Sequence, residues 1–368
     1  MRIVCITYSS SNDVRSPEEW LDRIKIFIGS WEKLAKIHEI IRIDQIAYSG
    51  LHKFNGIDYR FIQTKGRKTY LPWGLHRMLR KLSPDIVMVS GLHYPFQVIQ
   101  LRLLLPAHVR IIAQHHAEKP FKGIRKFLQF LADRFIDAYF FSSLELGQRW
   151  VKNGNLSDAN KIHEVMEVSS IFQPLDKRTA RLTTSVDGEP VYLWVGRLDD
   201  NKDPILVVKS FLRFCALQHS ARLYMIYQTE DLLPEIRQLL SGKDKEKIIL
   251  IGKLPHEDLQ FWYSGADFII SASHYEGSGT AVCEAMSCGC VPILTNIESF
   301  RAMTSLGQCG WLYEEGNEEA LLESLNKSIQ EDYAAQRVKT LQQFRQKLSF
   351  EAIAKKIQTI IESLTNGI

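Results

Sequence analysis

Two segments of the sequence combine basic residues, carboxylates and glycines in an order that suits a phosphorylated ligand. The first, residues 195–204, carries Arg197 and Lys202 on a short loop between a predicted strand and a predicted helix. A guanidinium and an ammonium held on one such loop can clamp a diphosphate. A surface ion-pair cluster with Asp199 and Asp200 is the alternative interpretation.

The second segment, residues 271–286, places the turn Gly277-Ser278-Gly279 between a predicted strand and a helix that begins at Thr280. Backbone N–H groups at the start of a helix have no partner within the helix and favour a bound anion. Because these glycines carry no side chain, a phosphate can approach the backbone closely. This segment therefore predicts a second part of a phosphate site.

Glu276 and Glu284 stand on either side of that helix start, with seven residues between them. At about 1.5 Å of rise per residue, they lie roughly 12 Å apart along the helix axis. This spacing suits one carboxylate on each side of a bound diphosphate, where each accepts hydrogen bonds from sugar hydroxyls. The alternative is two unrelated surface acids, but Glu284 lies among apolar residues, where an acid is costly without a partner.

Short apolar runs alternate with amphipathic stretches in both halves of the chain, which predicts two doubly wound α/β domains with parallel sheets. In such sheets ligands bind at the carboxyl ends of the strands, where both segments lie. The predicted strands are residues 2–8, 39–43, 84–90, 110–113, 138–142, 191–195, 223–227, 248–251, 268–271 and 291–294. The predicted helices are residues 17–35, 121–135, 204–217, 257–264, 280–287, 318–348 and 350–364.

Length and composition agree with two globular domains. The chain has 368 residues, of which 24% are charged and 45% are hydrophobic, which excludes disordered, collagen-like and coiled-coil chains. The first residues contain too short an apolar run for a signal peptide, and no run is long enough to span a bilayer. We therefore expect a cytoplasmic protein with domains at residues 1–175 and 185–349, joined by a polar linker at about 169–190.

The motifs Gly196-Arg197-Leu198 with Lys202, Glu276-Gly277-Ser278-Gly279, and Glu284-Ala285-Met286 with Cys288-Gly289 resemble the retaining glycosyltransferases of family 4. The resemblance covers the carboxyl half, and the paired glutamates are its most specific part. It implies the GT-B fold, in which two Rossmann-like domains face a central cleft. The first domain would bind the acceptor, the second would bind a nucleotide-sugar donor, and the final helix, 350–368, would pack back on the first.

The resemblance also assigns roles to individual residues. Glu276 would approach the donor sugar, and Glu284 would hold the ribose. The donor diphosphate would be bound by Arg197, Lys202, Gly277, Ser278, Gly279 and Thr280. The base would lie against the loop Gly252-Lys253-Leu254.

In the first half, residues 111–117 resemble the family's strand that ends in a histidine near the reaction centre. We assign that role to His116, with His115 in reserve; a structural histidine pair is the alternative. Two features depart from the family pattern. Residues 9–12 replace the usual Gly-Gly loop, and residues 166–170 replace a Pro-Asn-Gly turn.

The net charge of +4 conceals an uneven distribution. Residues 59–130 contain thirteen Lys and Arg against two acids, a local charge of +11, and the remainder is acidic. This segment indicates an anionic partner, although a solvated basic face without a ligand is the alternative. Its basic stretches, 65–81 and 119–126, interleave with aromatic residues, so a lipid-linked acceptor at a membrane surface and a soluble anionic acceptor both stay open. Nucleic acid is disfavoured because no binding module is recognisable.

The predicted activity is transfer of a hexose-type sugar to an acceptor hydroxyl with retention, in cell-envelope, polysaccharide or glycolipid synthesis. No Asp-x-Asp triplet occurs, so we expect metal-independent transfer with no cofactor beyond the donor as co-substrate. The alternative function is a non-catalytic sugar-nucleotide or glycan-binding scaffold. A dinucleotide-dependent dehydrogenase is disfavoured because no Gly-x-Gly-x-x-Gly follows the first strand. Cys283, Cys288 and Cys290 are expected to be buried small residues rather than a metal site.

Overall fold

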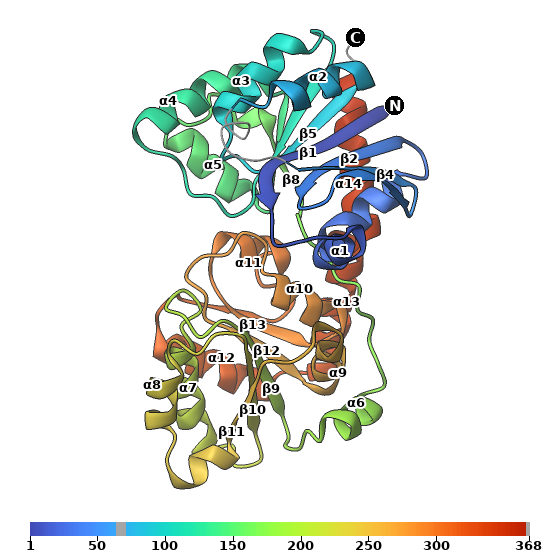
Figure 1. Cartoon of the computed structure of the whole chain (residues 1–368). Coiled ribbons are helices and arrows are strands. Elements are labelled where there is room, and N and C mark those ends of the chain that lie inside the picture. The colour runs from blue at the N-terminus through green and yellow to red at the C-terminus, as the bar shows by residue number, and fades with distance from the viewer. Residues whose placement is uncertain (64–70, 366–368) are drawn as a thin grey trace. The chain divides into compact units, whose positions relative to one another are not determined.

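A computed structural model describes residues 1–63 and 71–365, and it divides the chain into two compact units. The first unit comprises Met1–Ser169 and Phe350–Ile368, and the second comprises Ser170–Ser349 (Figure 1). Each unit is an α/β structure built on one sheet, which confirms the predicted fold class. Among the described residues, no helix has the length and apolar character needed to cross a membrane.

The first unit contains an eight-stranded sheet with the order β3-β4-β2-β1-β5-β6-β7-β8, in which only the pairing of β3 with β4 is antiparallel. From β1 the chain builds outward to β2 and then returns to add β5 on the other side, so the topological switch point lies between β1 and β5. The strands are β1 (Arg2–Ser11), β2 (Glu39–Ile46), β3 (Gly50–Phe54), β4 (Ile57–Ile62), β5 (Ile86–Ser90), β6 (Arg110–Gln114), β7 (Ala138–Phe141) and β8 (Ile162–Glu164).

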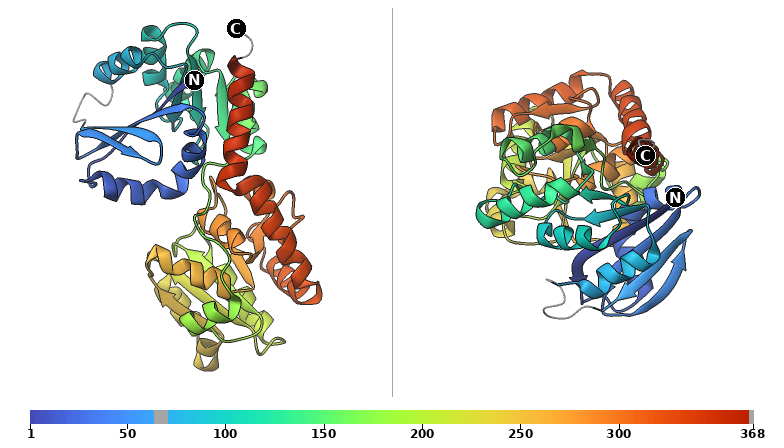
Figure 2. Two further views of the ribbon diagram at one scale, coloured as in Figure 1. Left: turned by 90° about the vertical axis from the view of Figure 1, so that its right-hand side faces the viewer. Right: turned by 90° about the horizontal axis from the view of Figure 1, so that it is seen from above.

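Helices connect these strands, and the last helix of the chain completes the unit. They are α1 (Pro17–Leu34), α2 (Trp73–Leu82), α3 (Pro95–Leu104), α4 (Gly123–Ala132), α5 (Leu144–Lys152) and α14 (Phe350–Thr365). Helix α14 packs on α1, as Figures 1 and 2 show. Gly29 permits this approach, because a Cβ there would lie 2.7 Å from the ring of Phe350. Lys33 Nζ pairs with Glu351 Oε1 at 2.6 Å on the same seam.

The second unit contains a six-stranded, wholly parallel sheet with the order β11-β10-β9-β12-β13-β14. Its switch point lies between β9 and β12. The strands are β9 (Val191–Gly196), β10 (Arg222–Tyr227), β11 (Ile248–Gly252), β12 (Phe268–Ser271), β13 (Val291–Thr295) and β14 (Trp311–Tyr313). The helices are α6 (Lys177–Thr184), α7 (Pro204–Cys215), α8 (Leu233–Leu239), α9 (Leu259–Gly265), α10 (Thr280–Ser287), α11 (Glu298–Met303), α12 (Glu318–Gln330) and α13 (Tyr333–Gln343).

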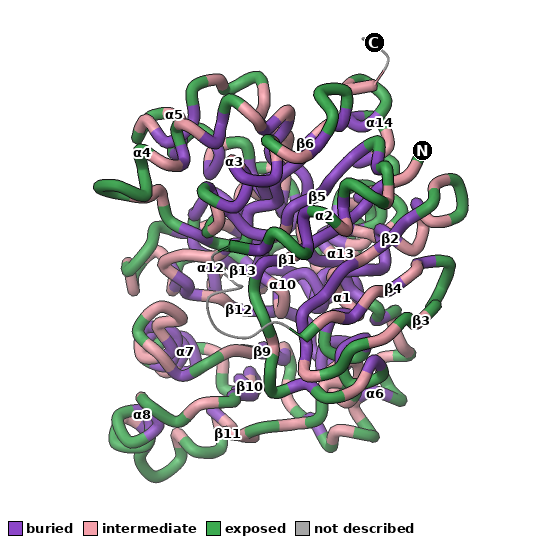
Figure 3. The backbone as a smooth tube through the Cα atoms, turned by 45° about the horizontal axis from the view of Figure 1, so that its top comes forward, coloured by how far each residue is buried: buried purple, intermediate pink, exposed green. Residues whose placement is uncertain are grey.

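Apolar residues cover both faces of this second sheet. Along β9, Tyr192 and Trp194 belong to one core cluster, whereas Val191 and Leu193 belong to the other. Successive side chains of a strand point to opposite faces, so a strand with a layer on each side is apolar at every position. Figure 3 shows such buried strands in purple. This burial on both faces explains why the strands appear in the sequence as unbroken apolar runs.

Two sequence predictions differ from the structure. The expected linker at 169–190 contains α6, which packs on α9 and belongs to the second unit. A helix begins there because Asp176 caps it by accepting from the backbone N–H of Thr179. The expected helix at 318–348 is divided, because Asp332 starts α13 by accepting from two backbone N–H groups, and a short π-helical turn, Phe344–Leu348, follows.

Candidate functional site

The two sequence segments with the predicted donor residues meet at the switch point of the second unit. Strands β9 and β12 are parallel neighbours, so the loops that follow them leave the sheet at the same edge. The backbone N–H of His274 donates to the carbonyl of Asn201 at 2.8 Å. The Asn201 side chain donates to the carbonyl of Tyr275 at 3.0 Å. These bonds fix the two loops side by side, in the place where ligands bind to doubly wound sheets.

Lys202 and Glu276, one from each loop, form an ion pair between Nζ and Oε1. Their side chains are only 22% and 13% exposed, so this pair is less screened by water than a surface pair. A cavity of about 10 Å³, lined also by Gly279, Ala281 and Val282, lies beside it. The ammonium and the carboxylate are thus brought together against the start of α10, and each is the other's counter-ion.

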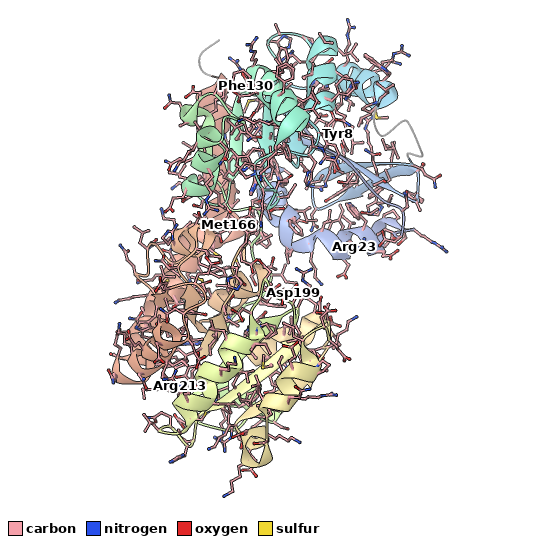
Figure 4. The ribbon with its side chains drawn as sticks, turned by 90° about the vertical axis from the view of Figure 1, so that its left-hand side faces the viewer. Tyr8, Arg23, Phe130, Met166, Asp199 and Arg213 are labelled. Atoms are coloured by element: carbon pink, nitrogen blue, oxygen red, sulfur yellow. The ribbon has the colours of Figure 1, made fainter. Side chains whose placement is uncertain are left out.

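Arg197 takes a different partner on the same loop. Its Nη2 lies 2.9 Å from Asp199 Oδ2, and its side chain is 58% exposed. Asp199, labelled in Figure 4, also accepts from the backbone N–H of Lys202 at 3.0 Å through Oδ1. An ion pair of the kind that the alternative interpretation expected is therefore present between Arg197 and Asp199, and the hydrogen bond from Lys202 N to Asp199 orders the loop that carries Lys202.

The start of α10 depends on a glycine. Gly279 occupies the N-cap position with φ +57°, and a Cβ there would lie 2.8 Å from Phe300 Cε1. The first bond within the helix runs from Cys283 N to Gly279 O at 3.0 Å. The N–H groups of Thr280 and Ala281 precede that bond, and such groups at a helix start attract anions. Gly277 and Ser278 lead into this turn and are buried.

Glu284 lies inside α10 and is 2% exposed. Its Oε1 accepts from His256 Nε2 at 2.6 Å, and its Oε2 accepts from the Tyr263 hydroxyl at 3.3 Å. Burial, together with the Glu284 carboxylate, raises the pKa of Tyr263 well above its usual value, so the hydroxyl keeps its proton. The buried Glu284 thus has two protein partners, and these hydrogen bonds offset the energetic cost of removing its carboxylate from water.

The predicted base loop leads to the same carboxylate. Gly252 ends β11 with φ +87°, Lys253 is exposed, and Leu254 is half-buried. His256 follows and reaches Glu284, with its ring 5.0 Å from that of Phe172. No sequence motif indicated a role for His256. The signal available in the sequence was Glu284 itself, because an acid in an apolar helix requires a partner such as His256.

His274 is a second residue that sequence analysis missed. Its Nε2 lies 3.2 Å from Asp203 Oδ2, and its Nδ1 lies 2.8 Å from Glu315 Oε1. Asp203 in turn caps α7 by accepting from the backbone N–H of Leu206 at 3.2 Å. His274 therefore ties the Glu276 loop to the helix that follows Lys202.

The first unit has a cavity of about 350 Å³ at its own switch point. The ends of β1, β5 and β6 and one face of α1 line it, and His116 follows β6. Strand β1 continues to Ser11 where the family pattern expects Gly-Gly, so Ser9 and Ser11 present hydroxyl groups to this cavity. Tyr94, also in the lining, donates to Ser9 Oγ at 2.9 Å.

His116 is held by two carboxylates of the same unit. Its Nδ1 contacts Glu167 Oε1, and its backbone N–H donates to Glu118 Oε2 at 2.5 Å. Glu118 also accepts from the backbone N–H of Leu92 at 2.6 Å, which joins the ends of β5 and β6. Burial lowers the pKa of His116, but the Glu167 carboxylate outweighs it and raises the pKa above the usual value. No sequence motif indicated a role for either acid.

His115 has a structural position. Its side chain is 1% exposed, its ring stacks on Phe141 at 4.6 Å, and its Nε2 donates to the Glu118 carbonyl at 2.8 Å. Burial lowers the pKa of His115. Of the two histidines, His116 lines the cavity and His115 belongs to the core.

Within the described ranges, no group of three or more His, Cys, Asp or Glu is arranged to hold a metal ion. The six cysteines are free and buried. Burial raises the pKa of Cys288 to about 11, so this thiol stays protonated at neutral pH. A protonated thiol is a poor metal ligand.

Two parallel-sheet α/β units in one chain, with the switch-point loops described above, define the GT-B fold class. Sucrose-phosphate synthase from Thermosynechococcus elongatus superimposes with a TM-score of 0.76 and 14% identity over 100% of both chains. The crystal structure of Anabaena HepE in complex with UDP superimposes with a TM-score of 0.75 and 14% identity over 99% of this chain and 100% of that chain. The predicted GT-B architecture is confirmed.

The family model of glycosyl transferases group 1 matches residues 177–347, the segment with the Lys202 and Glu276 loops. The O-antigen chain mannosyltransferase B of Escherichia coli is 32% identical over 82 residues, which is 22% of this chain and 21% of that protein. The tRNA-queuosine alpha-mannosyltransferase of Drosophila melanogaster is 27% identical over 104 residues, 28% of each chain. The chain thus spans less than a third of the length of these curated relatives.

Proposed function

We propose that this protein is a retaining glycosyltransferase that moves a hexose-type sugar from a nucleotide-sugar donor to an acceptor hydroxyl. The observation that carries the proposal is the Lys202–Glu276 pair at the start of α10. It combines a cation for a diphosphate with a carboxylate for a sugar at one switch point. The match of residues 177–347 to glycosyl transferases group 1 supports it.

Binding of the donor changes the partners within this site. The diphosphate takes Lys202 from Glu276, and the first N–H groups of α10 bind the phosphate oxygens. Glu276 is then free to accept from the sugar hydroxyls. Arg197, which is exposed beside Asp199, turns toward the same diphosphate. The loop that begins at Gly252 holds the base, and Glu284 binds the ribose by exchanging His256 for a hydroxyl.

In the transfer step the bond between the anomeric carbon and the diphosphate oxygen breaks. A new bond forms from that carbon to the acceptor oxygen, on the same face of the sugar. The departing phosphate takes the proton of the acceptor hydroxyl, so atoms and charge balance. Lys202, Arg197 and the helix start stabilise the charge that develops on the leaving group, as preorganised cations and dipoles do. His116, held by Glu167, orients the donor sugar.

The acceptor binds to the first unit. Its cavity of about 350 Å³ offers hydroxyl groups from Ser9 and Ser11, aromatic surface from Trp20, and the carboxylates of Glu118 and Glu167. Hydroxyls and carboxylates of this kind hydrogen-bond to polyols. An acceptor that carries several hydroxyl groups fits this lining, in a pathway of cell-envelope, polysaccharide or glycolipid synthesis.

The experiment measures release of the nucleoside diphosphate from a panel of donors, with and without candidate acceptors. Mannose and glucose donors come first, because two relatives are mannosyltransferases and a HepE structure contains UDP-glucose. Release that rises when an acceptor is added supports transfer. Donor binding without any release, across the panel, would favour the alternative of a non-catalytic sugar-nucleotide-binding scaffold.

Two further measurements define the chemistry. Thermal shifts with UDP, GDP and ADP identify the base, because a ligand that binds only the folded state raises the melting temperature. The anomeric configuration of the product, read by NMR, tests retention. We propose transfer without a metal; loss of all activity in EDTA, with recovery on addition of Mg²⁺, would contradict this.

A further inference from the structure

Helix α4 has its apolar side toward solvent. Ile124, Phe127 and Phe130 recur every three residues, so they form one stripe along the helix. Their exposed fractions are 70%, 55% and 38%. The residues of α4 that are buried, Gln129 and Ala132, lie on the opposite side at 100° per residue. An ordinary surface helix has the reverse arrangement.

The surroundings of this stripe are basic. Lys119, Lys122, Arg125 and Lys126 are all exposed, and no carboxylate occurs from Lys119 to Ala132. Figure 3 shows much of α4 in green, and Phe130 is labelled in Figure 4. We call the exposed side chains of Lys122, Ile124, Lys126, Phe127 and Phe130 the α4 face.

We propose that the α4 face docks on the surface of a bilayer that contains anionic lipids. Apolar side chains with cations at their flanks are the two components of interfacial helix binding. Long lysine side chains keep their ammonium groups at the headgroups while the apolar stripe enters the acyl boundary. The charge favours an anionic lipid surface as the occupant, because the exposed cations Lys122, Arg125 and Lys126 attract that surface electrostatically.

This docking is separate from the donor site. The α4 face belongs to the first unit, whereas Lys202 and Glu276 belong to the second. Vesicle binding can be measured without donor or acceptor. Its failure would therefore leave the proposed sugar transfer intact, and a failure of transfer would leave the docking intact.

The test is sedimentation of the full chain with vesicles of phosphatidylcholine alone, or with about a third of phosphatidylglycerol. We expect binding to the anionic vesicles and its loss in high salt, because salt screens the attraction. Ile124→Ser with Phe127→Ser should weaken binding at least about 10-fold, because each side chain buries apolar area in the lipid. Lys122→Gln with Lys126→Gln should weaken it by roughly 25-fold, at about 5-fold per cation.

The matched control is Leu182→Ser with Leu217→Ser, which removes two leucines of the second unit that are each 74% exposed. It should bind vesicles like the wild type, and thermal melts should show that every variant is folded. Equal binding by the α4 variants and the wild type would overturn the proposal. So would a dimer in sedimentation velocity that the Ile124/Phe127 variant abolishes without any vesicle binding, since a second copy would then cover the face.

Discussion

Lys202 and Glu276, which come from loops far apart in the sequence, are each other's counter-ion at the end of adjacent parallel strands. From the sequence we expect different partners for them, a diphosphate for Lys202 and a sugar for Glu276. In the structure they are paired with one another. The donor that we propose would therefore compete with Glu276 for the Lys202 ammonium.

This ion pair predicts that replacing Lys202 and replacing Glu276 have opposite effects on UDP affinity. Lys202→Ala should weaken UDP binding roughly 10- to 100-fold, the contribution of one hydrogen bond to a charged group. Glu276→Gln should tighten it about 5-fold, because the carboxylate that competes for Lys202 is gone. Isothermal titration with UDP measures both.

Lys209→Ala is the control, since it removes the same charge from an exposed position of α7 in the same unit. It should leave UDP affinity unchanged. A Glu276→Gln variant that binds UDP more weakly than the wild type would show that Glu276 does not compete for the ammonium.

The buried Glu284 predicts a difference between two substitutions. Glu284→Ala leaves the Tyr263 hydroxyl buried without its acceptor, and it should lower the free energy of unfolding by about 1–3 kcal/mol. It should also lower donor affinity or rate strongly. Glu284→Gln keeps an acceptor for Tyr263 and should retain most of the stability. Urea unfolding distinguishes stability from donor binding, and equal losses in both variants would contradict this account.

Much of the fold could be predicted because the strands are buried on both faces. Where a strand has helices above and below, as β12 has, its apolar run is continuous and its length is visible in the sequence. The hairpin of β3 and β4 was missed although Asn55-Gly56 is a strong turn signal, and both residues have the positive φ that such a turn needs. Its β3 residues are largely exposed, so no apolar run marks them.

Site residues could be predicted only where the residue type and its position after a strand indicate chemistry without knowledge of a partner. Lys202, Glu276 and Gly279 follow strand ends and were identified on that basis. His256 and Glu167 were not, because each acts through a residue distant in sequence, Glu284 and His116 respectively. Pairings of this kind depend on the packing of loops. Basic residues 65, 67 and 68 of the predicted anionic-partner segment, with Tyr70, lie outside the described residues.

His116 and Glu167 predict a histidine with a pKa above the usual 6.5. A raised pKa means that the pair stabilises the fold fully below pH 6.5 and loses this contribution as pH rises through the folded value. Glu167→Gln should lower the pKa of His116, leaving burial as the main effect. NMR titration of the imidazole resonances, assigned with a His116→Ala variant, measures the change. An unchanged or higher pKa in Glu167→Gln would contradict the assignment.

His76 predicts the reverse pH dependence. It is buried, its Nε2 lies 2.9 Å from the Tyr8 hydroxyl, and burial lowers its pKa from 6.5 to about 4. Below pH 6.5 the unfolded chain takes up a proton that the folded chain refuses, so stability falls until about pH 4. Between pH 7.5 and pH 5 this group should account for about 2 kcal/mol of lost stability.

The measurement is urea unfolding of the wild type and of His76→Gln, in which the amide still accepts from Tyr8. The variant should be less stable at pH 7.5 but should lose less stability on acidification. A slope equal to that of the wild type would assign the acid sensitivity to other groups.

Gly279 predicts a defect that combines strain with a clash. Gly279→Ala places a side chain at φ +57°, with its Cβ 2.8 Å from Phe300 Cε1. The matched control is Gly242→Ala, at φ +47° with nothing within 4 Å, which isolates the backbone strain alone. The control should cost about 1 kcal/mol of unfolding free energy. Gly279→Ala should cost more, because the clash must be relieved by movement at the start of α10.

That movement displaces the N–H groups next to the Lys202–Glu276 pair, so UDP affinity should fall in Gly279→Ala and stay unchanged in Gly242→Ala. Equal UDP affinity in the two variants would place the diphosphate away from the α10 start.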